Sequence, residues 1–471
     1  MKTIQTDVAV IGAGTAGLAA YRAAKAAGAR TVHIEGGPYG TTCARVGCMP
    51  SKLLIAAAEA SHAIDTAPGF GLHIEGAKRI DGREVMARVR NERDRFVGFV
   101  LEGVDKTPPE DRLIGHAKFL DPGTLEIDGH TRVEARAIVI ATGSRPSIPD
   151  SLKGLGDRLV VNDDVFSWQD LPRSVAVLGP GVIGLELGQA LHRLGVRVVV
   201  LGRGGRLGPI TDPEVRNVAE RAFKQELRLE PDAKPGRIER QGDEVLVEWH
   251  SADGASHSER FDYLLVATGR LPNVDRLAID RAGVALDGKG VPLFDQRTLQ
   301  AGKSAIFIAG DAANDIPLLH EAADEGRIAG ENAARFPNVA PGLRRAGIGV
   351  VFSDPQIAVI GGGWHAQRPG SFATGRVSFE DQGRSRVMLA NKGVLHVYGE
   401  LVSGRFLGAE MVGPRAEHIA HLLSWAVQNK MTIAKMLEMP FYHPVIEEGL
   451  RTALRDAQAK LKLASQAQRA A

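Results

Sequence analysis

The feature that most constrains the fold of this chain is a pattern of apolar run, glycine-rich turn and helix-forming stretch that occurs twice. In the first copy, an apolar run at 7–11 leads into Gly-Ala-Gly-Thr-Ala-Gly at 12–17, and an Ala-rich stretch follows at 18–27. The second copy begins with an apolar run at 174–178 and continues through a similar turn and helix to 194. Strand, G-x-G-x-x-G turn and helix in this order form a dinucleotide-binding fingerprint. We therefore expect an α/β protein with two Rossmann-like domains.

The glycines of the first copy meet the requirements of a bound pyrophosphate. Gly12, Gly14 and Gly17 let the backbone approach the phosphates, and the helix N-terminus offers unpaired N–H groups and positive potential. Glu35 ends the next apolar strand, at 31–35, where a carboxylate can accept hydrogen bonds from ribose hydroxyls. The corresponding glycines of the second copy are Gly179, Gly181 and Gly184.

Each fingerprint is followed later by another apolar strand with the same ending. The strand at 137–140 runs into Ala-Thr-Gly at 141–143, and the strand at 263–266 runs into Ala-Thr-Gly at 267–269. This is an internal repeat of whole nucleotide-binding units and not a short solenoid period. Two such units in a chain that also has a pair of cysteines close to the first fingerprint imply two cofactors that exchange electrons.

The chain has only two cysteines, Cys43 and Cys48, and both lie in one short segment. A disulfide between them would close too small a loop to stabilise the fold much. A regular helix rises about 7.5 Å over five residues, whereas bridged Cα atoms usually lie ~4.4–6.8 Å apart. The pair therefore requires an irregular turn, with Cys48 opening a helix that Pro50 helps to start. We interpret the pair as a redox-active dithiol, and a structural disulfide or two inert thiols are the alternatives.

Composition restricts the classes of function. A hydrophobic content of 44%, a charged content of 24% and a net charge of +2 are ordinary for globular proteins. No basic stripe with interleaved aromatic residues is present, which argues against nucleic acid as a partner. The sequence has no signal peptide, no apolar stretch long enough to span a membrane and no Cys/His cluster for a metal. With the low cysteine content, this predicts a cytoplasmic protein of about three or four domains.

Further motifs connect these features to a known family. Gly310-Asp311 follows an apolar strand at 305–309, Phe-Ser-Asp-Pro occupies 352–355, and His-Pro-Val-Ile-Glu-Glu occupies 443–448. With both fingerprints and the Cys-x4-Cys loop, the chain resembles the class I pyridine nucleotide–disulfide oxidoreductases over essentially its whole length.

Two segments are most similar to one branch of this family. Pro-Ser-Lys at 50–52 and Leu-His-Glu-Ala-Ala-Asp-Glu-Gly at 319–326 most resemble dihydrolipoyl dehydrogenase. Family members that handle mercury carry extra cysteines near the C-terminus, which this chain lacks. Mercuric reductase activity is therefore not expected.

The resemblance implies that the first unit binds FAD and the second binds NAD(P)H. In the family, the aspartate that corresponds to Asp311 binds the ribityl chain of FAD. The other FAD positions that the resemblance implies are Thr42, Lys52, Ala117, Thr142, Gly143 and Gly310, and Gly269 is implied for NAD(P).

The dithiol and a nearby cation suggest a redox centre. Cys48 at a helix N-terminus would have its thiolate favoured by the dipole, and Lys52 lies one turn further on the same face. The resemblance assigns Cys48 to the flavin and Cys43 to exchange with substrate, and it pairs Lys52 with Glu186. The alternatives are a solvated helix charge for Lys52 and a first-turn complement to the helix dipole for Glu186.

Thiol–disulfide exchange also needs a base within reach of the exchanging sulfur. His443 is the candidate, because histidine titrates near neutral pH and because Pro444 and a carboxylate five positions on, Glu448, follow the family motif. Glu448 would fix the imidazole tautomer. The resemblance places this pair against the dithiol of the other subunit, which implies a homodimer. The alternative is that His443 merely flanks a helix at 446–450.

The second fingerprint departs from the first at the end of its following strand. Glu35 lies 18 residues after the third glycine, and the same offset from Gly184 falls on Gly202, with Arg203 and Arg206 after it. A missing acid with nearby arginines accommodates a 2′-phosphate, which predicts that NADPH binds at least as well as NADH. The alternative is that both arginines are solvated loop residues. Gly184 itself favours NADH, because NADPH-dependent members of the resembled family often have alanine there.

We expect four segments along the chain: an FAD-binding domain at 1–146, an NAD(P)-binding domain at 147–270, a central return to the FAD domain at 271–342, and an α+β dimerisation domain at 343–471. Segments 108–130 and 225–260 are expected to form short hairpin-like strands.

These inferences predict a flavoprotein that passes electrons between NAD(P)H, FAD, the Cys43–Cys48 disulfide and a small dithiol or disulfide. Dihydrolipoamide/lipoamide is the leading substrate. One alternative is an NADPH-dependent reductase of another small disulfide, similar to glutathione reductase. Another is a flavoprotein redox sensor, against which His443 and Glu448 argue, because a sensor has little need of an exchange base.

Overall fold

The computed structural model describes residues 1–470 and separates into two compact units, each assembled from three segments of the chain. The first unit contains Met1–Pro50, Val89–Ser147 and Gly269–Arg345, and the second contains Ser51–Arg88, Ile148–Thr268 and the segment from Ala346 onward. Two boundaries fall within helices, α3 (Cys48–Thr66) and α4 (Gly82–Asp105).

A mostly parallel sheet forms the centre of the first unit. Its strand order is β3-β2-β1-β6-β5-β4, and β17 pairs with β6 outside this path. Strands β1, β2, β3, β6 and β17 run in parallel, whereas β4 and β5 are antiparallel additions. The strands are β1 (Lys2–Ile11), β2 (Thr31–Glu35), β3 (Arg112–Ile114), β4 (Ala117–Asp121), β5 (Thr124–Ile127), β6 (Thr131–Ile140) and β17 (Ile306–Ile308).

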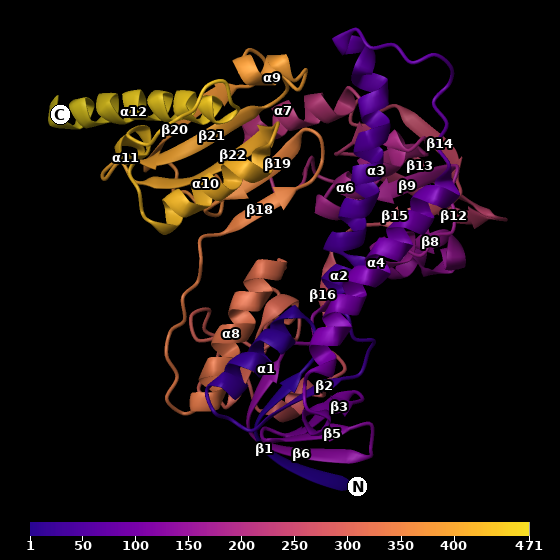
Figure 1. Cartoon of the computed structure of the whole chain (residues 1–471), viewed down its shortest axis with the longest axis vertical. Helices are drawn as coiled ribbons and strands as arrows, with labels where there is room; N and C mark the ends of the chain where they lie inside the picture. Colours follow the sequence, from indigo (N-terminus) through magenta and orange to yellow (C-terminus); the bar gives the residue numbers. More distant parts are fainter. Residues whose placement is uncertain (471) are drawn as a thin grey trace. The chain divides into compact units, whose positions relative to one another are not determined.

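Helices α1 (Thr15–Ala26) and α8 (Leu319–Arg335) lie side by side in this unit (Figure 1). Their backbones approach closely, because Gly326 and Gly330 of α8 face Ala16 and Ala20 of α1. A Cβ at either glycine would lie 2.1 or 2.2 Å from the carbonyl oxygen of the facing alanine. This packing fixes α1 against the sheet, with the glycine-rich turn at its N-terminus.

A second parallel sheet forms the nucleotide-binding part of the second unit, in the order β11-β10-β9-β15-β8. It contains β8 (Leu159–Val160), β9 (Ser174–Leu178), β10 (Arg197–Leu201), β11 (Leu229–Glu230) and β15 (Tyr263–Val266), with helices α5 (Asn162–Val165), α6 (Val182–Arg193) and α7 (Pro213–Lys224). Beside it lies a three-stranded antiparallel sheet of β12 (Lys234–Gln241), β13 (Glu244–His250) and β14 (Ser256–Phe261).

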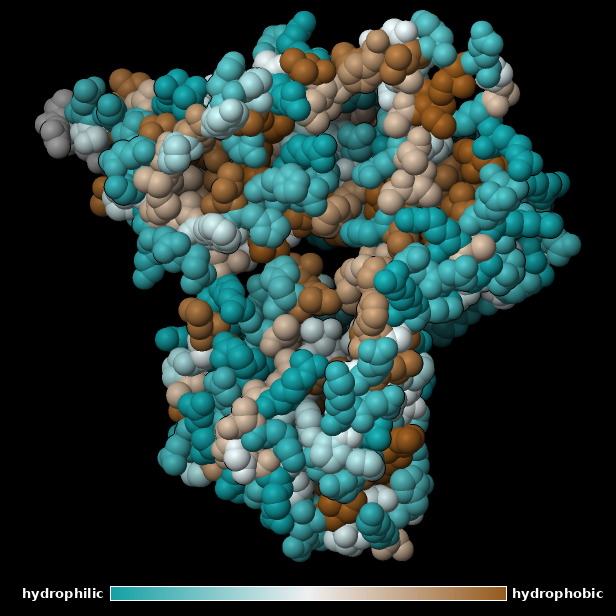
Figure 2. Space-filling model, in the orientation of Figure 1, coloured by the Kyte–Doolittle hydropathy of each residue, from teal (hydrophilic) through white to brown (hydrophobic). Residues whose placement is uncertain are grey.

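The C-terminal part of the second unit is an antiparallel sheet, β18-β19-β22-β21-β20, with helices packed on it. The strands are β18 (Ile348–Val351), β19 (Gln356–Ile360), β20 (Phe372–Ser378), β21 (Val394–Glu400) and β22 (Phe406–Gly413), and the helices are α9 (Gly383–Val387), α10 (Ala416–Gln428), α11 (Ile433–Leu437) and α12 (Glu447–Ala470). Figure 2 shows hydrophobic side chains among hydrophilic ones on the surface of this domain, where Trp425 and Tyr442 are 68% and 79% exposed.

Short elements complete the structure. Strands β7 (Ser144–Pro146) and β16 (Arg270–Pro272) form an antiparallel pair. The remaining short helices are α2 (Thr42–Val46) and five 3-10 turns, at Ala67–Phe70, Pro109–Asp111, Asp150–Arg158, Ile279–Ala282 and Gly310–Ala313.

The predicted fold class is confirmed, with two Rossmann-like sheets and a C-terminal α+β domain. Helix α1 begins at Thr15, three residues earlier than its Ala-rich stretch suggests, because the turn after Gly14 is already helical. The expected hairpin-like strands are found within 108–130 and 225–260. The four-segment boundaries remain a prediction. Among residues 1–470, no helix is long and apolar enough to cross a membrane, and no cluster of His, Cys, Asp and Glu suits a metal ion.

Candidate active site

The two cysteines lie on either side of a break between two helices. Helix α2 gives way to α3 through Gly47, whose φ of −129° and ψ of −118° interrupt the helical geometry, and α3 begins at Cys48. No disulfide joins the two cysteines, and the hydrogen bond that the Cys43 thiol makes to Cys48 raises the pKa of Cys43, an effect that burial strengthens. Thr41 caps α2 with a positive φ of 57°, and its hydroxyl accepts a hydrogen bond from Ala44 N at 3.3 Å. The expected irregular turn is therefore present, and it keeps the two sulfurs in contact.

Lys52, on α3, forms an ion pair with Glu186, on α6. The Nζ–Oε2 distance is 2.7 Å, and the side chain of Glu186 is only 5% exposed. The other oxygen of Glu186 accepts a hydrogen bond from Phe352 N at 3.0 Å, and Lys52 Nζ lies 4.4 Å from the centre of the Phe352 ring. The ion pair that the resemblance implied is therefore present, and three segments of the second unit hold the cation in place.

His443 and Glu448 meet at the start of α12. Nδ1 of His443 lies 2.9 and 3.1 Å from the two carboxylate oxygens of Glu448. The hydrogen bond to His443 lowers the pKa of Glu448, and the carboxylate also contacts Val445 N and Arg451. With Nδ1 donating to a carboxylate, the neutral imidazole has Nε2 as its free acceptor. The His443 side chain is 81% exposed, so this nitrogen is available to a group that approaches from outside the chain.

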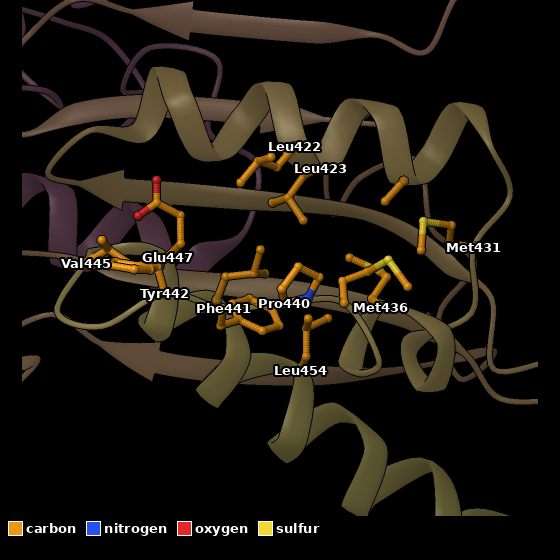
Figure 3. Close-up of a pocket in the computed structure, with 13 residues that line it drawn as sticks. Leu422, Leu423, Met431, Met436, Pro440, Phe441, Tyr442, Val445, Glu447 and Leu454 are labelled. Atoms are coloured by element: carbon orange, nitrogen blue, oxygen red, sulfur yellow. The ribbon is translucent and has the colours of Figure 1, made fainter.

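An apolar pocket of about 350 Å³ adjoins the segment that carries His443. Pro440, Phe441 and Tyr442 line it from one side, and residues of α10, α11, α12 and the segments that connect them line the rest (Figure 3). The pocket belongs to the C-terminal domain, so the base lies beside a largely apolar surface.

The first fingerprint has the local geometry that a pyrophosphate requires. Gly12 has φ of 108°, and a Cβ there would lie 2.3 Å from Ala141 O; a Cβ at Gly17 would lie 1.9 Å from Gly12 O. In contrast, a Cβ at Gly14 would meet nothing within 4 Å. The outer glycines therefore serve the turn and the close packing, and Gly14 leaves open space where a ligand can approach the backbone.

The residues around this turn fit a dinucleotide. Glu35 accepts hydrogen bonds from Ala13 N at 2.7 Å and Gly37 N at 2.8 Å, so its carboxylate lies at the fingerprint. The Thr142 hydroxyl is buried and has no hydrogen-bond partner within the described chain, and Gly143 beside it has φ of 68°. An unpartnered hydroxyl and a carboxylate beside an open glycine turn are suited to the hydroxyls and phosphates of FAD.

Asp311 is held at the end of β17 by residues of the β7–β16 pair. Its Oδ2 accepts from Ser144 Oγ at 2.6 Å, and Arg270 Nε lies 4.0 Å away. Arg270 also donates to the Ser144 hydroxyl and carbonyl, each at 2.8 Å. Ser144 was not among the residues predicted for this site, although its place directly after Ala-Thr-Gly is a usable signal. Of the other expected FAD residues, Thr42 is exposed at the start of α2, whereas Ala117 is 5% exposed and packs in the core at the start of β4.

The second fingerprint repeats the geometry of the first. Gly179 has φ of 106°, and a Cβ there would lie 2.4 Å from Ala267 O; a Cβ at Gly184 would lie 1.9 Å from Gly179 O. The space around Gly181 is open to 4 Å. Gly269, after β15, has φ of 128°. The turn therefore fits a second dinucleotide.

Gly202, where an acid would bind a ribose, is closed to any side chain. A Cβ there would lie 2.5 Å from Pro180 Cγ and 2.7 Å from Pro231 O. Pro180 also accepts a hydrogen bond from Gly208 N at 2.7 Å, and Gly204 N donates to Asp232 at 2.8 Å. The loop after β10 is therefore anchored on the fingerprint, a contact that the sequence analysis did not predict.

Arg203 and Arg206 project from this anchored loop. Both are exposed, and no carboxylate of the described residues lies within ion-pair distance of either. Two guanidinium groups without an intramolecular partner are available to an anion such as a phosphate.

The fold and these sites agree with comparisons to known proteins. The chain matches the pyridine nucleotide-disulphide oxidoreductase family over residues 6–326 and the dimerisation domain of that family over residues 348–454. It is 31% identical to mercuric reductase of Shigella flexneri, over 95% of this chain and 80% of that protein. It is 30% identical to dihydrolipoyl dehydrogenase of Thermus scotoductus, over 96% of this chain and 97% of that protein.

Two solved structures share the fold. LpdA from Mycobacterium tuberculosis has a TM-score of 0.79 and 23% identity, covering 97% of this chain and 99% of that one. The flavoprotein disulfide reductase RclA from Escherichia coli has a TM-score of 0.78 and 22% identity, covering 96% of this chain and 99% of that one.

The chain belongs to the pyridine nucleotide–disulphide oxidoreductase family. It is accordingly a flavin-dependent oxidoreductase with FAD and NAD(P)H as cofactors, and its dimerisation domain indicates a homodimer.

Proposed function

We propose that this enzyme oxidises dihydrolipoamide, or reduces lipoamide, with NAD(P)(H) as the second substrate. The observation that carries the proposal is the oriented His443–Glu448 pair in a chain whose only cysteines are the paired Cys43 and Cys48. A base that accepts a thiol proton and a single dithiol are the groups that exchange with a small dithiol requires. The absence of further cysteines argues against a metal ion as the substrate.

The exchange can be written with its atoms in balance. A substrate thiolate attacks Cys43 Sγ of the oxidised pair, which forms a mixed disulfide and releases Cys48 as a thiolate. The second substrate thiolate attacks the substrate sulfur of the mixed disulfide, which forms the substrate disulfide and releases Cys43. Nε2 of His443 takes the proton of the first attacking thiol and passes it to solvent, then takes the proton of the second and gives it to the released Cys43 thiolate, while Glu448 stabilises the imidazolium at each stage. Bound FAD supplies the two-electron chemistry that links the dithiol to NAD(P).

We further propose that His443 serves the dithiol of the partner subunit. The pair lies in the dimerisation domain, and the exposed side chain of His443 leaves its outer nitrogen unused within one chain. Each homodimer would then contain two active sites shared between subunits.

A second candidate is an NADPH-driven reductase of another small disulfide. The closed position at Gly202, together with the unpaired Arg203 and Arg206, favours a 2′-phosphate over a free 2′-hydroxyl. Both candidates use the same dithiol and base, and they differ in the nucleotide and in the substrate.

The test is the oxidation of dihydrolipoamide by the purified FAD-loaded enzyme, with NAD+ and NADP+ assayed side by side. Fast turnover with either nucleotide supports the lipoamide proposal, and the preferred nucleotide reports on the Gly202 loop. No turnover with either nucleotide contradicts it. NADPH-dependent reduction of a panel of small disulfides would then identify the second candidate.

A further inference from the structure

A cluster of buried acids on α8 lies outside the exchange chemistry. The side chains of Glu321, Asp324 and Glu325 are 2%, 7% and 1% exposed. Carboxylates are rarely buried this fully, because losing hydration disfavours the charged form. Burial raises the pKa of Glu325 to about 7, against the opposing effects of Arg344 and a backbone N–H. Burying the carboxyl of Glu325 therefore lowers the stability of the fold, compared with placing it on the exposed face of the helix.

The two oxygens of Glu325 contact two different parts of the first unit. Oε2 accepts a hydrogen bond from Gly310 N at 2.7 Å. Oε1 lies 2.9 Å from Nη2 of Arg344. Glu325 thus connects α8 to the turn that follows β17.

That turn leads directly into Asp311, the residue expected to bind the ribityl chain of FAD. Gly310 has φ of 69°, and a Cβ there would lie 2.9 Å from Ala16 Cβ and 3.3 Å from Ala322 Cβ. The turn is therefore pressed against α1 and α8. The Gly310 N–H is the polar group of the turn that points towards α8, and Glu325 is its acceptor.

Arg344 holds the acid from the other side. Its guanidinium also lies 3.2 Å from Glu321 and 3.6 Å from Asp315, and it donates to Gln296 O at 3.0 Å. One cation therefore compensates three carboxylates. Arg344 stands at the end of the first unit's chain segment, two residues before Ala346.

We propose that Glu325, held by Arg344, is a positioning residue for FAD. It fixes the Gly310–Asp311 turn by accepting the Gly310 N–H, so that the Asp311 carboxylate is already oriented when the cofactor binds. This inference concerns cofactor retention and is independent of which disulfide the enzyme uses.

The test measures FAD release from the purified holoenzyme after dilution, followed by the fluorescence of free flavin at a temperature where circular dichroism shows the protein fully folded. Glu325→Leu removes the acceptor, and we expect release to become about ten- to a hundredfold faster, the order of one lost charge-assisted hydrogen bond. Glu325→Gln keeps an acceptor at the same length, and release should stay within about threefold of wild type.

Asp324→Asn is the matched control, because Asp324 is a buried acid on the same helix that pairs with Arg345 and does not contact the turn. Its release rate should change less than about twofold. Equal release from Glu325→Leu and Asp324→Asn would overturn the proposal, as would equal release from Glu325→Leu and Glu325→Gln.

If Glu325→Leu does not fold, Arg344→Gln provides the second test. It leaves the buried Glu321 and Glu325 and the half-buried Asp315 without their shared cation, and FAD release about three- to tenfold faster than in Asp324→Asn is expected. A release rate equal to that of the control would again overturn the proposal.

Discussion

Glu448 brings both carboxylate oxygens to Nδ1 of His443, at 2.9 and 3.1 Å, from the first turn of α12. The proline between them begins the segment 444–447 that turns the chain back towards the imidazole. This arrangement sets the tautomer of the base without burying it, so the proton-accepting nitrogen faces away from the chain that carries it.

His443→Gln should therefore impair exchange while leaving electron input intact. We expect dihydrolipoamide turnover to fall by about 10²- to 10⁴-fold, the usual contribution of a general base. Reduction of the enzyme by NADPH or NADH, followed by stopped-flow absorbance, should change little. Glu417→Gln, on a different helix, is a control for nonspecific loss of activity. Turnover of His443→Gln within tenfold of wild type would contradict the assignment of the base.

Lys52 should matter to stability because Glu186 is nearly buried. Lys52→Met leaves that carboxylate without its cation, and we expect the free energy of unfolding to fall by about 2 kcal/mol, the order found for a broken buried pair that keeps other hydrogen bonds. Glu186→Gln should cost less, since an amide needs no counter-ion. Urea denaturation measures both.

The double variant Lys52→Met/Glu186→Gln decides whether the ion pair is the cause. If it is, the double variant should be more stable than Lys52→Met alone, because the stranded charge is gone. If the decreases in the free energy of unfolding of the two single variants add up in the double variant, Lys52 stabilises the protein through its packing on Phe352 and not through the ion pair.

The Gly202 loop predicts a selective effect on the two nucleotides. Removing both guanidinium groups with Arg203→Ala/Arg206→Ala should raise the Kd of NADP+ at least tenfold and change the Kd of NAD+ less than about threefold. Arg221→Ala, an exposed arginine on α7, is the matched control. Isothermal titration calorimetry of the holoenzyme measures these constants. If the Kd values of NADP+ and NAD+ rise by the same factor, the two arginines do not bind the 2′-phosphate.

Two glycines with ordinary φ angles should respond to alanine in opposite ways. Gly181 has open space around its missing Cβ, so Gly181→Ala should be as stable as wild type. The variant should bind both NAD+ and NADP+ more weakly, because the added methyl group lies where the pyrophosphate approaches the backbone. Gly202→Ala places a methyl group against Pro180 and Pro231, so its melting temperature should fall by several degrees. Thermal unfolding and nucleotide titration of the two variants test the contrast. Similar behaviour of both would refute this division of roles.

The local parts of this molecule could be predicted from the sequence, and the long-range contacts could not. The two glycine turns, the strands at 7–11 and 174–178 and the helix break before Cys48 depend on neighbouring residues, whose periodicity and conformational freedom are visible in the chain. The Lys52–Glu186 pair joins residues 134 positions apart and came only from the family resemblance.

Other contacts could be predicted neither from the local sequence pattern nor from the family resemblance. The closure of Gly202 depends on Pro180 and Pro231, which come together only when the sheet has formed. The support of Gly310 by Glu325 depends on α8 packing against α1. The grouping of 51–88 with the second unit likewise depends on tertiary packing and not on composition.

His33 should make the protein sensitive to acid. Its side chain in β2 is fully buried between the rings of Tyr21 and Tyr39, and neither ring nitrogen has a hydrogen-bond partner among the described residues. Burial lowers the pKa of His33 from 6.5 to about 4. Below pH 6.5 the imidazole of the unfolded chain is protonated, whereas that of the folded chain stays neutral until about pH 4. The contribution of the neutral His33 to the free energy of unfolding is therefore complete above pH 6.5 and is lost as the pH falls through this window. The loss is on the order of 3 kcal/mol.

His33→Phe keeps an aromatic ring between the two tyrosines and removes the titration. We expect its melting temperature to fall less than that of wild type between pH 7.5 and pH 4.5, as measured by circular dichroism. His130→Phe is the control, because His130 is exposed and belongs to the same sheet region. If protonation of His33 causes the loss of stability, the melting temperatures of wild type and His33→Phe must diverge as the pH falls. Equal decreases in the two melting temperatures over this range would show that the acid sensitivity of the first unit arises from other groups.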